Sequence, residues 1–307
     1  MVENINILII GGDSFVAKSF IAYHRNNYNI KLISRSETNY QNEIILNDFF
    51  EIPIDAFKDI DIVINCAAIV HQPKETSNDL YNKINCELAV LNAKKAKENG
   101  VKTFIQLSTI AVYGSTENIS DLSIENPNNL YGSSKLKADK ILFTLSDEAF
   151  NTIILRPSML YGGGNAPGNM MKLIGFADKS IPLPFKNANN KRFFLNIHNL
   201  IGFIEASILY KQSNIFVLCD NESISTKELI SQISKSLKKA DKQISIPQSL
   251  LSILKKIKPD IFNKLYGELT IDNTRATEIL GFNPTHNIEQ GIIEMTKYYL
   301  DNKNKKT

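Results

Sequence analysis

The chain has 307 residues, of which 43% are hydrophobic and 22% are charged, and its formal net charge is +3. These values predict a soluble globular protein of one or two domains. No apolar stretch approaches the roughly 18 residues that a membrane-spanning helix needs, and the first apolar run is too short for a signal peptide. We therefore expect a cytoplasmic protein without membrane insertion.

The cysteines and lysines argue against several kinds of site. Cys66, Cys86 and Cys219 show neither a C-x-x-C spacing nor a nearby histidine, so we expect no disulfide framework and no metal site. Cys66 and Cys219 end apolar runs, as small buried residues do. His71, which follows the fourth expected strand, either faces an active site at the end of that strand or is a structural histidine. Lysines gather near the C-terminus without interleaved aromatic residues, which favours a solvated helix face over a nucleic-acid or membrane surface. They are Lys235, Lys238, Lys239, Lys242, Lys255, Lys256, Lys258 and those of the tail 303–306.

The first half of the chain alternates short apolar runs with helical patterns. Near-continuous apolar strands joined by helices predict an α/β fold with a Rossmann-like, doubly wound parallel sheet that is covered on both faces. Such sheets bind ligands at the carboxyl ends of their strands. The expected strands are Ile5–Ile10, Ile30–Ile33, Glu43–Leu46, Ile62–Asn65, Thr103–Leu107 and Thr152–Leu155, and the expected helices are Phe15–Arg25, Leu80–Asn99 and Tyr131–Phe150.

The second half is expected to be less regular. Glycines and prolines predict that 161–190 is mostly loop. Phe193–Ile197 and Asn214–Leu218 are expected to return to the sheet. We predict one domain over 1–160, to which 193–218 returns, and a smaller interleaved domain over 161–192 and 219–307. The helices expected there are Thr226–Lys239, one that begins at Pro247, Thr274–Leu280 and Ile288–Leu300.

The first strand runs into Gly11-Gly12-Asp13-Ser14 and then directly into a helix that begins with Phe15 and Val16. A dinucleotide-binding turn needs glycine for a tight bend, for close approach of the pyrophosphate and for close packing of helix on strand. Gly11 supplies the bend, and Ala17 is small enough for the packing. Ser14 holds the middle position, where its side chain must point away from a phosphate or hydrogen-bond to it. Alone, this stretch is equally typical of a plain strand–helix turn.

The second and third strands end in residues that bear on the cofactor. No acidic residue follows the second strand to accept hydrogen bonds from an adenosine ribose, as NAD would favour. Ser34 and Arg35 stand there instead, and they suit a 2′-phosphate, although a surface arginine is often unengaged. After the third strand, Asp48, followed by Phe49, either accepts from an adenine amino group or caps a helix.

Tyr131 and Lys135 lie four residues apart at the start of an expected helix, so they share one of its faces. An ammonium beside a phenol lowers the pKa of that phenol toward the range of a general acid–base. In a lysine-rich chain with eleven tyrosines, such a pair also arises by chance.

The order of several short motifs gives these residues a context. The segment Thr109–Gly114 comes directly after an expected strand. It consists of a hydroxyl residue, two apolar residues and Val-Tyr-Gly, and Tyr131 and Lys135 follow it later in the chain. The chain resembles the NAD-dependent epimerase/dehydratase family, extended short-chain dehydrogenases that act on nucleotide sugars, and the resemblance favours a working cofactor turn. Further matches, in family order, are Asn65–Ala68, Asn85, Leu155–Pro157, Tyr161–Gly162, Arg192–Ile197 and Leu280–Pro284.

The resemblance implies a role for individual residues. Thr109 would hydrogen-bond the reacting sugar oxygen, Tyr131 would move its proton, and Lys135 would hold the nicotinamide ribose and keep Tyr131 acidic. Asn169 and Arg192 would reach the phosphates of the sugar nucleotide; a solvated Arg192 is the alternative. The cofactor would be bound by Gly11, Ser14, Phe15, Val16, Ser34, Arg35, Asp48, Phe49, Ala67, Tyr131, Lys135 and Pro157.

Departures from the family pattern narrow the chemistry. Ile110 and Ala111 stand where the 4,6-dehydratases carry an Asp-Glu pair, and Ile110 also replaces the cysteine of the 3,5-epimerase/reductases. Neither residue moves protons, so dehydration and 3,5-epimerisation are not expected. A second diphosphate arginine of many 4-epimerases has no clear match near Thr270–Asp272.

With these two reactions excluded, we expect a reaction at C4 of a UDP-(N-acetylated) hexose or 4-keto-6-deoxyhexose. Residues 167–192 are similar to a subgroup that processes UDP-N-acetylated deoxyhexoses for surface polysaccharides. Ser34 and Arg35 favour NADP(H) and a 4-keto reductase; a 4-epimerase with tightly bound NAD is the alternative, and a non-catalytic NADP-sensing protein is a remote one. The resemblance also implies a homodimer built from the helices over 80–99 and 131–150. No nucleic-acid partner is expected.

Overall fold

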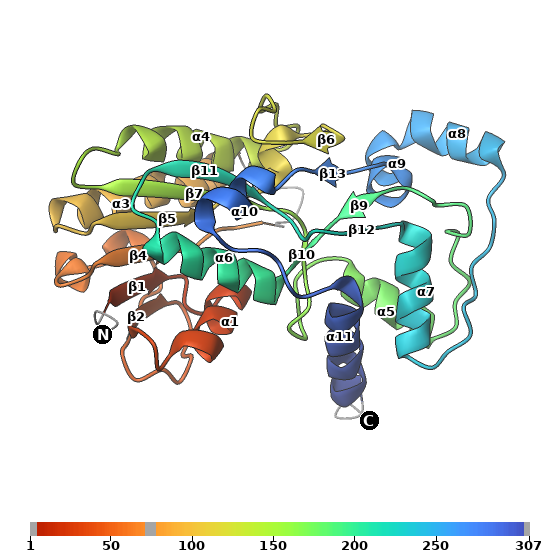
Figure 1. Cartoon of the computed structure of the whole chain (residues 1–307), viewed down its shortest axis with the longest axis horizontal. Helices are drawn as coiled ribbons and strands as arrows, with labels where there is room; N and C mark the ends of the chain where they lie inside the picture. Colours follow the sequence, from red (N-terminus) through yellow and green to blue (C-terminus); the bar gives the residue numbers. More distant parts are fainter. Residues whose placement is uncertain (1–4, 71–77, 304–307) are drawn as a thin grey trace.

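The computed structural model describes residues 5–70 and 78–303, so His71 lies outside the described residues. A seven-stranded sheet crosses the molecule in the order β11-β7-β5-β4-β1-β2-β3, and all neighbouring strands are parallel (Figure 1). The strands are β1 (Asn6–Ile10), β2 (Asn29–Ser34), β3 (Glu43–Ile45), β4 (Ile62–Asn65), β5 (Thr103–Leu107), β7 (Asn151–Pro157) and β11 (Asn214–Leu218). The order reverses between β1 and β4, which is where a doubly wound sheet opens a ligand crevice. The predicted fold class is confirmed.

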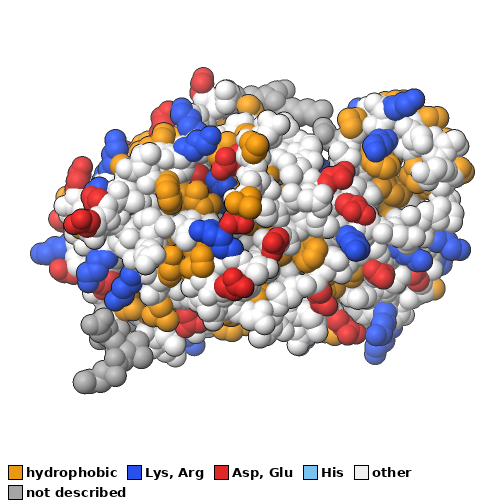
Figure 2. Space-filling model, turned by 45° about the horizontal axis from the view of Figure 1, so that its top comes forward, with side chains coloured by type: hydrophobic (Ala, Val, Ile, Leu, Met, Phe, Trp, Pro, Cys, Tyr) orange, Lys and Arg blue, Asp and Glu red, His pale blue; other side chains and the backbone are white. Residues whose placement is uncertain are grey.

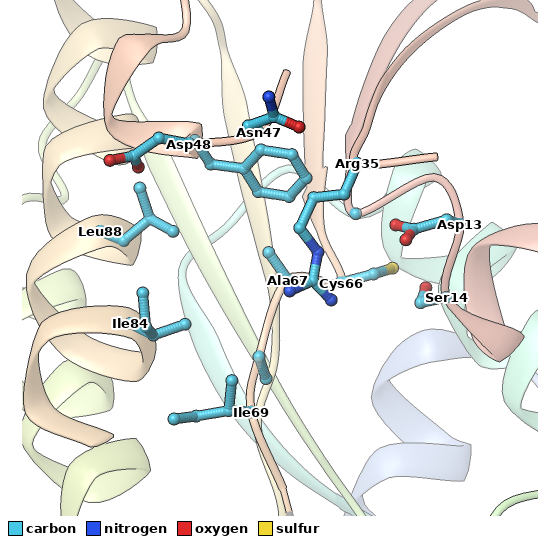
Figure 3. Close-up of a pocket in the computed structure, with 13 residues that line it drawn as sticks. Asp13, Ser14, Arg35, Asn47, Asp48, Cys66, Ala67, Ile69, Ile84 and Leu88 are labelled. Carbon is cyan, nitrogen blue, oxygen red and sulfur yellow. The ribbon is translucent and has the colours of Figure 1, made fainter. Parts of the chain in front are cut away.

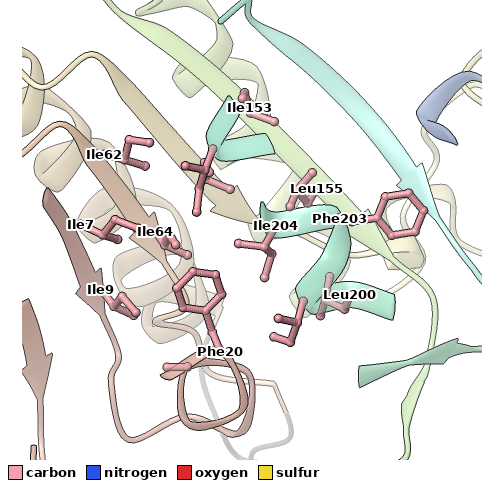
Figure 4. Close-up of a cluster of buried hydrophobic side chains, with 14 of the residues drawn as sticks. Ile7, Ile9, Phe20, Ile62, Ile64, Ile153, Leu155, Leu200, Phe203 and Ile204 are labelled. Carbon is pink, nitrogen blue, oxygen red and sulfur yellow. The ribbon is translucent and has the colours of Figure 1, made fainter. Parts of the chain in front are cut away.

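Helices cover both faces of this sheet because alternate strand residues point to opposite sides. Ile7 and Ile9 of β1 pack with Phe20 of α1 (Phe15–His24) and with α6 (Ile197–Leu209), as Figure 4 shows. Leu8 and Ile10 face the opposite side, which is covered by α3 (Leu88–Glu98) and α4 (Leu130–Thr144). The sheet is therefore buried on both faces, as its apolar strands predicted.

The long helix predicted over 80–99 consists of three segments in succession, α2 (Asn78–Asn82), a π-helical turn η3 (Lys83–Glu87) and α3. Asn85, in the π turn, is fully buried. Its amide accepts from the Ile69 N–H at 2.8 Å and donates to the Ile69 carbonyl and the Ser134 hydroxyl at 3.0 Å each. The π turn thereby ties the segment after β4 to α4, and π turns often mark functional sites.

One prediction for 161–218 is wrong. Residues 193–197 do not join the main sheet: β9 (Arg192–Phe193) pairs with β12 (Ser223–Ile224), and β10 (Leu195–Asn196) pairs with β8 (Leu160–Tyr161). Residues 161–190 are mostly loop, as predicted, but they also contain the helix α5 (Met170–Asp178). The return of Asn214–Leu218 to the sheet, as β11 beside β7, is confirmed.

The C-terminal helices surround a small core beside the sheet (Figure 1). Residues of α5, α7 and α11 form this core, which includes Ile174, Ile233 and Met295. No helix within 5–70 and 78–303 is long and apolar enough to cross a membrane. The remaining elements are η1 (Phe49–Glu51), η2 (Ile54–Phe57), η4 (Ile110–Tyr113), β6 (Asn118–Ile119), α7 (Thr226–Ser236), α8 (Gln248–Ile257), α9 (Pro259–Tyr266), β13 (Thr270–Ile271), α10 (Thr274–Leu280) and α11 (Ile288–Lys303).

Candidate functional site

The turn after β1 approaches the end of β4 more closely than a side chain allows. Gly11 has φ +85°, and a Cβ there would lie 2.9 Å from the Ala67 nitrogen. Ser14 caps α1, since its hydroxyl accepts from the Ala17 N–H at 3.2 Å. The next donors are the N–H groups of Phe15 and Val16, which a helix leaves without intrahelical partners. The middle position, where the sequence departs from glycine, is thus occupied by a helix-capping serine beside an anion-binding helix end.

A substitution at Gly11 tests the need for this close approach. We expect Gly11→Ala to abolish cofactor binding and to lower the free energy of unfolding by about 1–3 kcal/mol, because the added methyl group meets backbone and the positive φ is strained. Cofactor titration and denaturant unfolding measure both effects. Gly281→Ala is the matched control: its φ of +64° is also positive, but nothing lies within 4 Å of its Cβ. If both variants bind cofactor like the parent protein, the turn is only a strand–helix connection.

A cavity of about 310 Å³ opens between this turn and the helix of Ile84 and Leu88, at the carboxyl ends of β1, β2 and β4 (Figure 3). Cys66 lines this cavity and is half-buried, whereas the sequence predicted a buried apolar residue. Burial raises the pKa of its thiol to about 12. Six residues predicted to bind the cofactor line the same cavity: Gly11, Ser14, Arg35, Asp48, Phe49 and Ala67.

Ser34 and Arg35, predicted together as a 2′-phosphate site, lie apart. Ser34 is fully buried beneath Gly12, where a Cβ would lie 2.6 Å from the Ser34 hydroxyl oxygen. Arg35 is exposed, and its side chain reaches from the end of β2 into the cavity (Figure 3). Of these two residues, Arg35 lines the cavity and Ser34 does not. The prediction that the Ser34 hydroxyl faces the cofactor is therefore not supported.

Asp48 combines the two roles that the sequence left open. Its carboxylate accepts from the Phe50 N–H at 2.9 Å and so caps η1, and the same residue lines the cavity. Capping therefore does not remove Asp48 from the cavity.

Phe15, which was also predicted to bind the cofactor, packs its ring into the hydrophobic cores, so that only its backbone is near the turn.

Tyr131 and Thr109 meet near the carboxyl end of β5. Tyr131 lies in the first turn of α4, where Asn129 caps the helix by accepting from the Gly132 N–H at 2.8 Å. Thr109 caps η4, accepting from the Ala111 N–H at 3.1 Å. Burial raises the pKa of Tyr131 to about 12, and a hydrogen bond with the Thr109 hydroxyl opposes this shift. The phenol is therefore protonated at neutral pH and in contact with the threonine hydroxyl.

Lys135 lies one turn further along α4 and is fully buried. Its ammonium donates to the Leu107 carbonyl at 2.5 Å, and burial lowers its pKa to about 8. Burial is the largest influence on the pKa of the Tyr131 phenol, and that Lys135 keeps this phenol acidic stays a prediction. The spacing placed both side chains on one face, but it carried no information on their burial.

A buried ion pair stands behind Lys135 and was missed in the sequence. Asp139 accepts from the Arg156 Nε at 3.0 Å and from the Ser108 hydroxyl at 2.7 Å. Arg156 also donates to the Tyr113 hydroxyl at 2.8 Å and to Glu125 at 3.1 Å. Burial raises the pKa of Asp139, while Arg156 and Lys135 lower it. The signal was present, since Tyr131, Lys135 and Asp139 repeat every four residues and so follow one helix face.

The residues predicted to hold the substrate phosphates lie apart from the cavity beside Gly11. Asn169 is exposed at the start of α5. Arg192 donates to the carbonyls of Asn263 and Gly267 at 3.0 Å each, so it is held against the C-terminal end of α9 rather than solvated. Pro157 is buried at the end of β7. Across 5–70 and 78–303, no three His, Cys, Asp or Glu side chains gather as a metal ion would require.

Comparison with known proteins shows the family to which this chain belongs. The profile of the NAD dependent epimerase/dehydratase family matches residues 7–206. A UDP-glucose 4-epimerase of Vibrio cholerae is 28% identical, and the alignment covers 98% of this chain and 97% of that protein. An N-acetyl-alpha-D-glucosaminyl-diphospho-ditrans,octacis-undecaprenol 4-epimerase of Escherichia coli O157:H7 is 25% identical over 86% of this chain and 82% of that protein.

Solved structures agree on the fold. MoeE5 in complex with UDP-glucose and NAD superposes with a TM-score of 0.80 at 18% identity and covers 97% of this chain and 99% of its own. A UDP-N-acetylglucosamine 4-epimerase from Bacillus cereus gives a TM-score of 0.77 at 18% identity, over 96% of this chain and 98% of its own. From the family match, the chain belongs to the NAD-dependent epimerase/dehydratase family and is an enzyme.

Proposed function

We propose that this protein is a UDP-hexose 4-epimerase that retains NAD. Its full-length similarity to the UDP-glucose 4-epimerase of Vibrio cholerae supports this reaction more than a 4-keto reduction. The burial of Ser34 supports it too, because the 2′-phosphate site that favoured NADP(H) is reduced to Arg35. The observation that carries the proposal is the contact between Tyr131 and Thr109 at the end of β5, beside the buried Lys135.

The residues present fit a dinucleotide. Gly11 leaves space where a Cβ would block the turn, the N-terminus of α1 supplies N–H donors, and Asp48 offers a carboxylate in the same cavity. The nicotinamide, when bound, supplies the acceptor and donor of hydride at the sugar carbon. Lys135, as the resemblance implies, would hold the nicotinamide ribose and contribute a positive charge near the Tyr131 phenol.

Tyr131 and Thr109 supply the proton chemistry at the C4 oxygen. The Thr109 hydroxyl orients that oxygen, and Tyr131 takes its proton and later returns it. Taking the proton requires a phenolate, so positive charge near the phenol, to which the Lys135 ammonium would contribute, must lower the pKa of Tyr131 from about 12. Asn169 and Arg192 are the residues proposed to meet the diphosphate.

A 4-keto reductase that uses NADPH is the second candidate, favoured by the position of Arg35 over the cavity. A polyprenyl-diphosphate-linked hexosamine is a second substrate class, because the Escherichia coli relative is named for such a substrate. A homodimer through α3 and α4, on which Phe143 is exposed, and the division into two domains stay predictions.

The cofactor retained by the purified protein separates the two reactions. We expect mass spectrometry to find bound NAD, and NMR to find the C4 epimer of UDP-glucose or UDP-N-acetylglucosamine without added cofactor. Arg35→Ala should then change the Kd for NAD by less than about threefold, since a charged hydrogen bond of roughly 1.5–3 kcal/mol is lost only if Arg35 holds a phosphate. An empty site that prefers NADPH, and loses about 10–100-fold affinity in Arg35→Ala, would overturn the epimerase in favour of the reductase.

A further inference from the structure

The helix α8 carries an apolar stripe that nothing within the described chain covers. Leu250, Ile253 and Ile257 are 54%, 50% and 68% exposed, and they follow each other at three- and four-residue intervals along one face. Ile261 of α9 adds a further apolar side chain, 47% exposed. Branched aliphatic side chains grouped in this way are uncommon on a free surface, where scattered single ones are the rule.

Lysines lie beside the stripe. Lys256, Lys258 and Lys264 are exposed, whereas the Lys255 ammonium lies 5.4 Å from the centroid of the Phe262 ring of α9, and residues 248–266 contain a single acidic residue. In Figure 2 the lobe at the upper right, which α8 and α9 form in Figure 1, shows hydrophobic side chains beside lysines. Together they give each helix an apolar side with a basic border.

Contacts with each other and with the rest of the protein hold α8 and α9 in place. The helices contact each other, with the Lys255 ammonium over the Phe262 ring, and the rings of Phe262 and Tyr266 are stacked. The C-terminal end of α9 is held by Arg192, and Thr226 donates to the Leu265 carbonyl at 2.8 Å. The exposed side chains are therefore not part of the small core, and removing them leaves these anchoring contacts intact.

We propose that α8 and α9 dock the protein on the surface of an anionic phospholipid bilayer. An interfacial helix buries Leu and Ile side chains at the boundary of headgroups and acyl chains, while its lysines meet anionic headgroups. A second copy of the chain is a poorer occupant, because facing stripes would bring two lysine borders of the same sign together. The sequence alone predicted a solvated lysine face, and the exposed stripe of α8 is the observation that changes this interpretation.

Docking goes beyond the proposed reaction and does not depend on it. It would place Arg192, which contacts α9, close to the bilayer, where a lipid-linked sugar diphosphate lies. A water-soluble UDP-hexose can be turned over with or without docking. Vesicle binding and turnover are therefore separate measurements, and failure of one leaves the other interpretable.

Vesicle flotation with the full chain tests the proposal. Two sets of vesicles are used, pure phosphatidylcholine and equal parts phosphatidylcholine and phosphatidylglycerol. We expect binding to the anionic vesicles only, and a weakening of at least about tenfold in the triple variant Leu250→Ser, Ile253→Ser, Ile257→Ser. Each lysine removed in Lys256→Gln and Lys258→Gln should weaken binding roughly fivefold at low salt.

The matched control removes exposed apolar side chains elsewhere, as Leu209→Ser, Ile279→Ser, Ile293→Ser, and should bind like the parent protein. Circular dichroism and thermal unfolding confirm that each variant is folded. Absence of binding to the anionic vesicles, or equal losses in the control, would overturn the proposal. So would an α8 variant that keeps vesicle binding but changes the sedimentation mass, since this assigns the stripe to a second copy.

Discussion

Tyr131→Phe is expected to lower kcat by roughly 10²–10⁴-fold, the contribution typical of a positioned general acid–base. The variant loses only the phenolic oxygen, which contacts Thr109, so its fold and its binding of nucleotide sugar should be preserved. Steady-state turnover gives kcat, and calorimetric titration gives the Kd of the UDP-hexose, which should stay within about threefold of the parent value. Such a split between kcat and Kd marks a group that acts in the transition state.

Three further variants serve as controls for this experiment. Tyr210→Phe also removes a hydrogen-bonded phenol, one that contacts Gln212 away from the site, and should leave kcat unchanged. Thr109→Ser keeps the hydroxyl that contacts Tyr131 and should retain more activity than Thr109→Val. If Tyr131→Phe keeps more than a tenth of the parent kcat, the proton is moved by another group and the assignment of Tyr131 is wrong.

The sheet could be predicted from the sequence because its strands are buried on both faces and therefore read as unbroken apolar runs. The same rule misled at the start of α6, because the apolar run Phe193–Ile197 predicts a strand, whereas its last residue is the first residue of this helix. The helix α5 was missed because glycines and prolines before and after it predicted loop. The π turn around Asn85 depends on bonds to Ile69 and Ser134, which no local pattern encodes.

The site shows the same limit in its electrostatics. Spacing placed Tyr131 and Lys135 on one helix face, the family resemblance added Thr109, and the strand ends placed Arg35 and Asp48 at one cavity. The pKa values follow from burial, which raises that of Tyr131 and lowers that of Lys135, and burial is a property of the whole fold. For this reason the sequence identified which groups meet, but not which of them is charged.

The largest stability effect is expected at Asp139, the buried partner of Arg156. Asp139→Asn should lower the free energy of unfolding by about 3–5 kcal/mol, because the buried Arg156 guanidinium loses its buried carboxylate partner and keeps only Glu125. Denaturant unfolding measures the loss. Glu289→Gln breaks the exposed pair of Lys235 and Glu289, which are 3.1 Å apart, and should cost less than about 1 kcal/mol.

Asp139 is also expected to act as a positioning residue, through the charge of Lys135. Its carboxylate raises the pKa of Lys135 against the effect of burial, which brings that pKa to about 8. Without this carboxylate the pKa of Lys135 falls further, so the ammonium is lost at a lower pH. The alkaline limb of kcat/KM should therefore move to lower pH in Asp139→Asn, and activity lost at neutral pH should return in part on acidification.

A double variant separates these two roles of the buried pair. Asp139→Leu with Arg156→Met replaces both charges of the pair by apolar side chains, which is often neutral or stabilising, and Glu125, which also loses Arg156, is only partly buried. We expect this variant to recover most of the lost stability, while the alkaline limb stays at the lower pH because Lys135 still lacks Asp139. Recovery of the parent pH profile together with stability would show that the pair only holds the fold, since its carboxylate would then have no influence on the charge beside Tyr131.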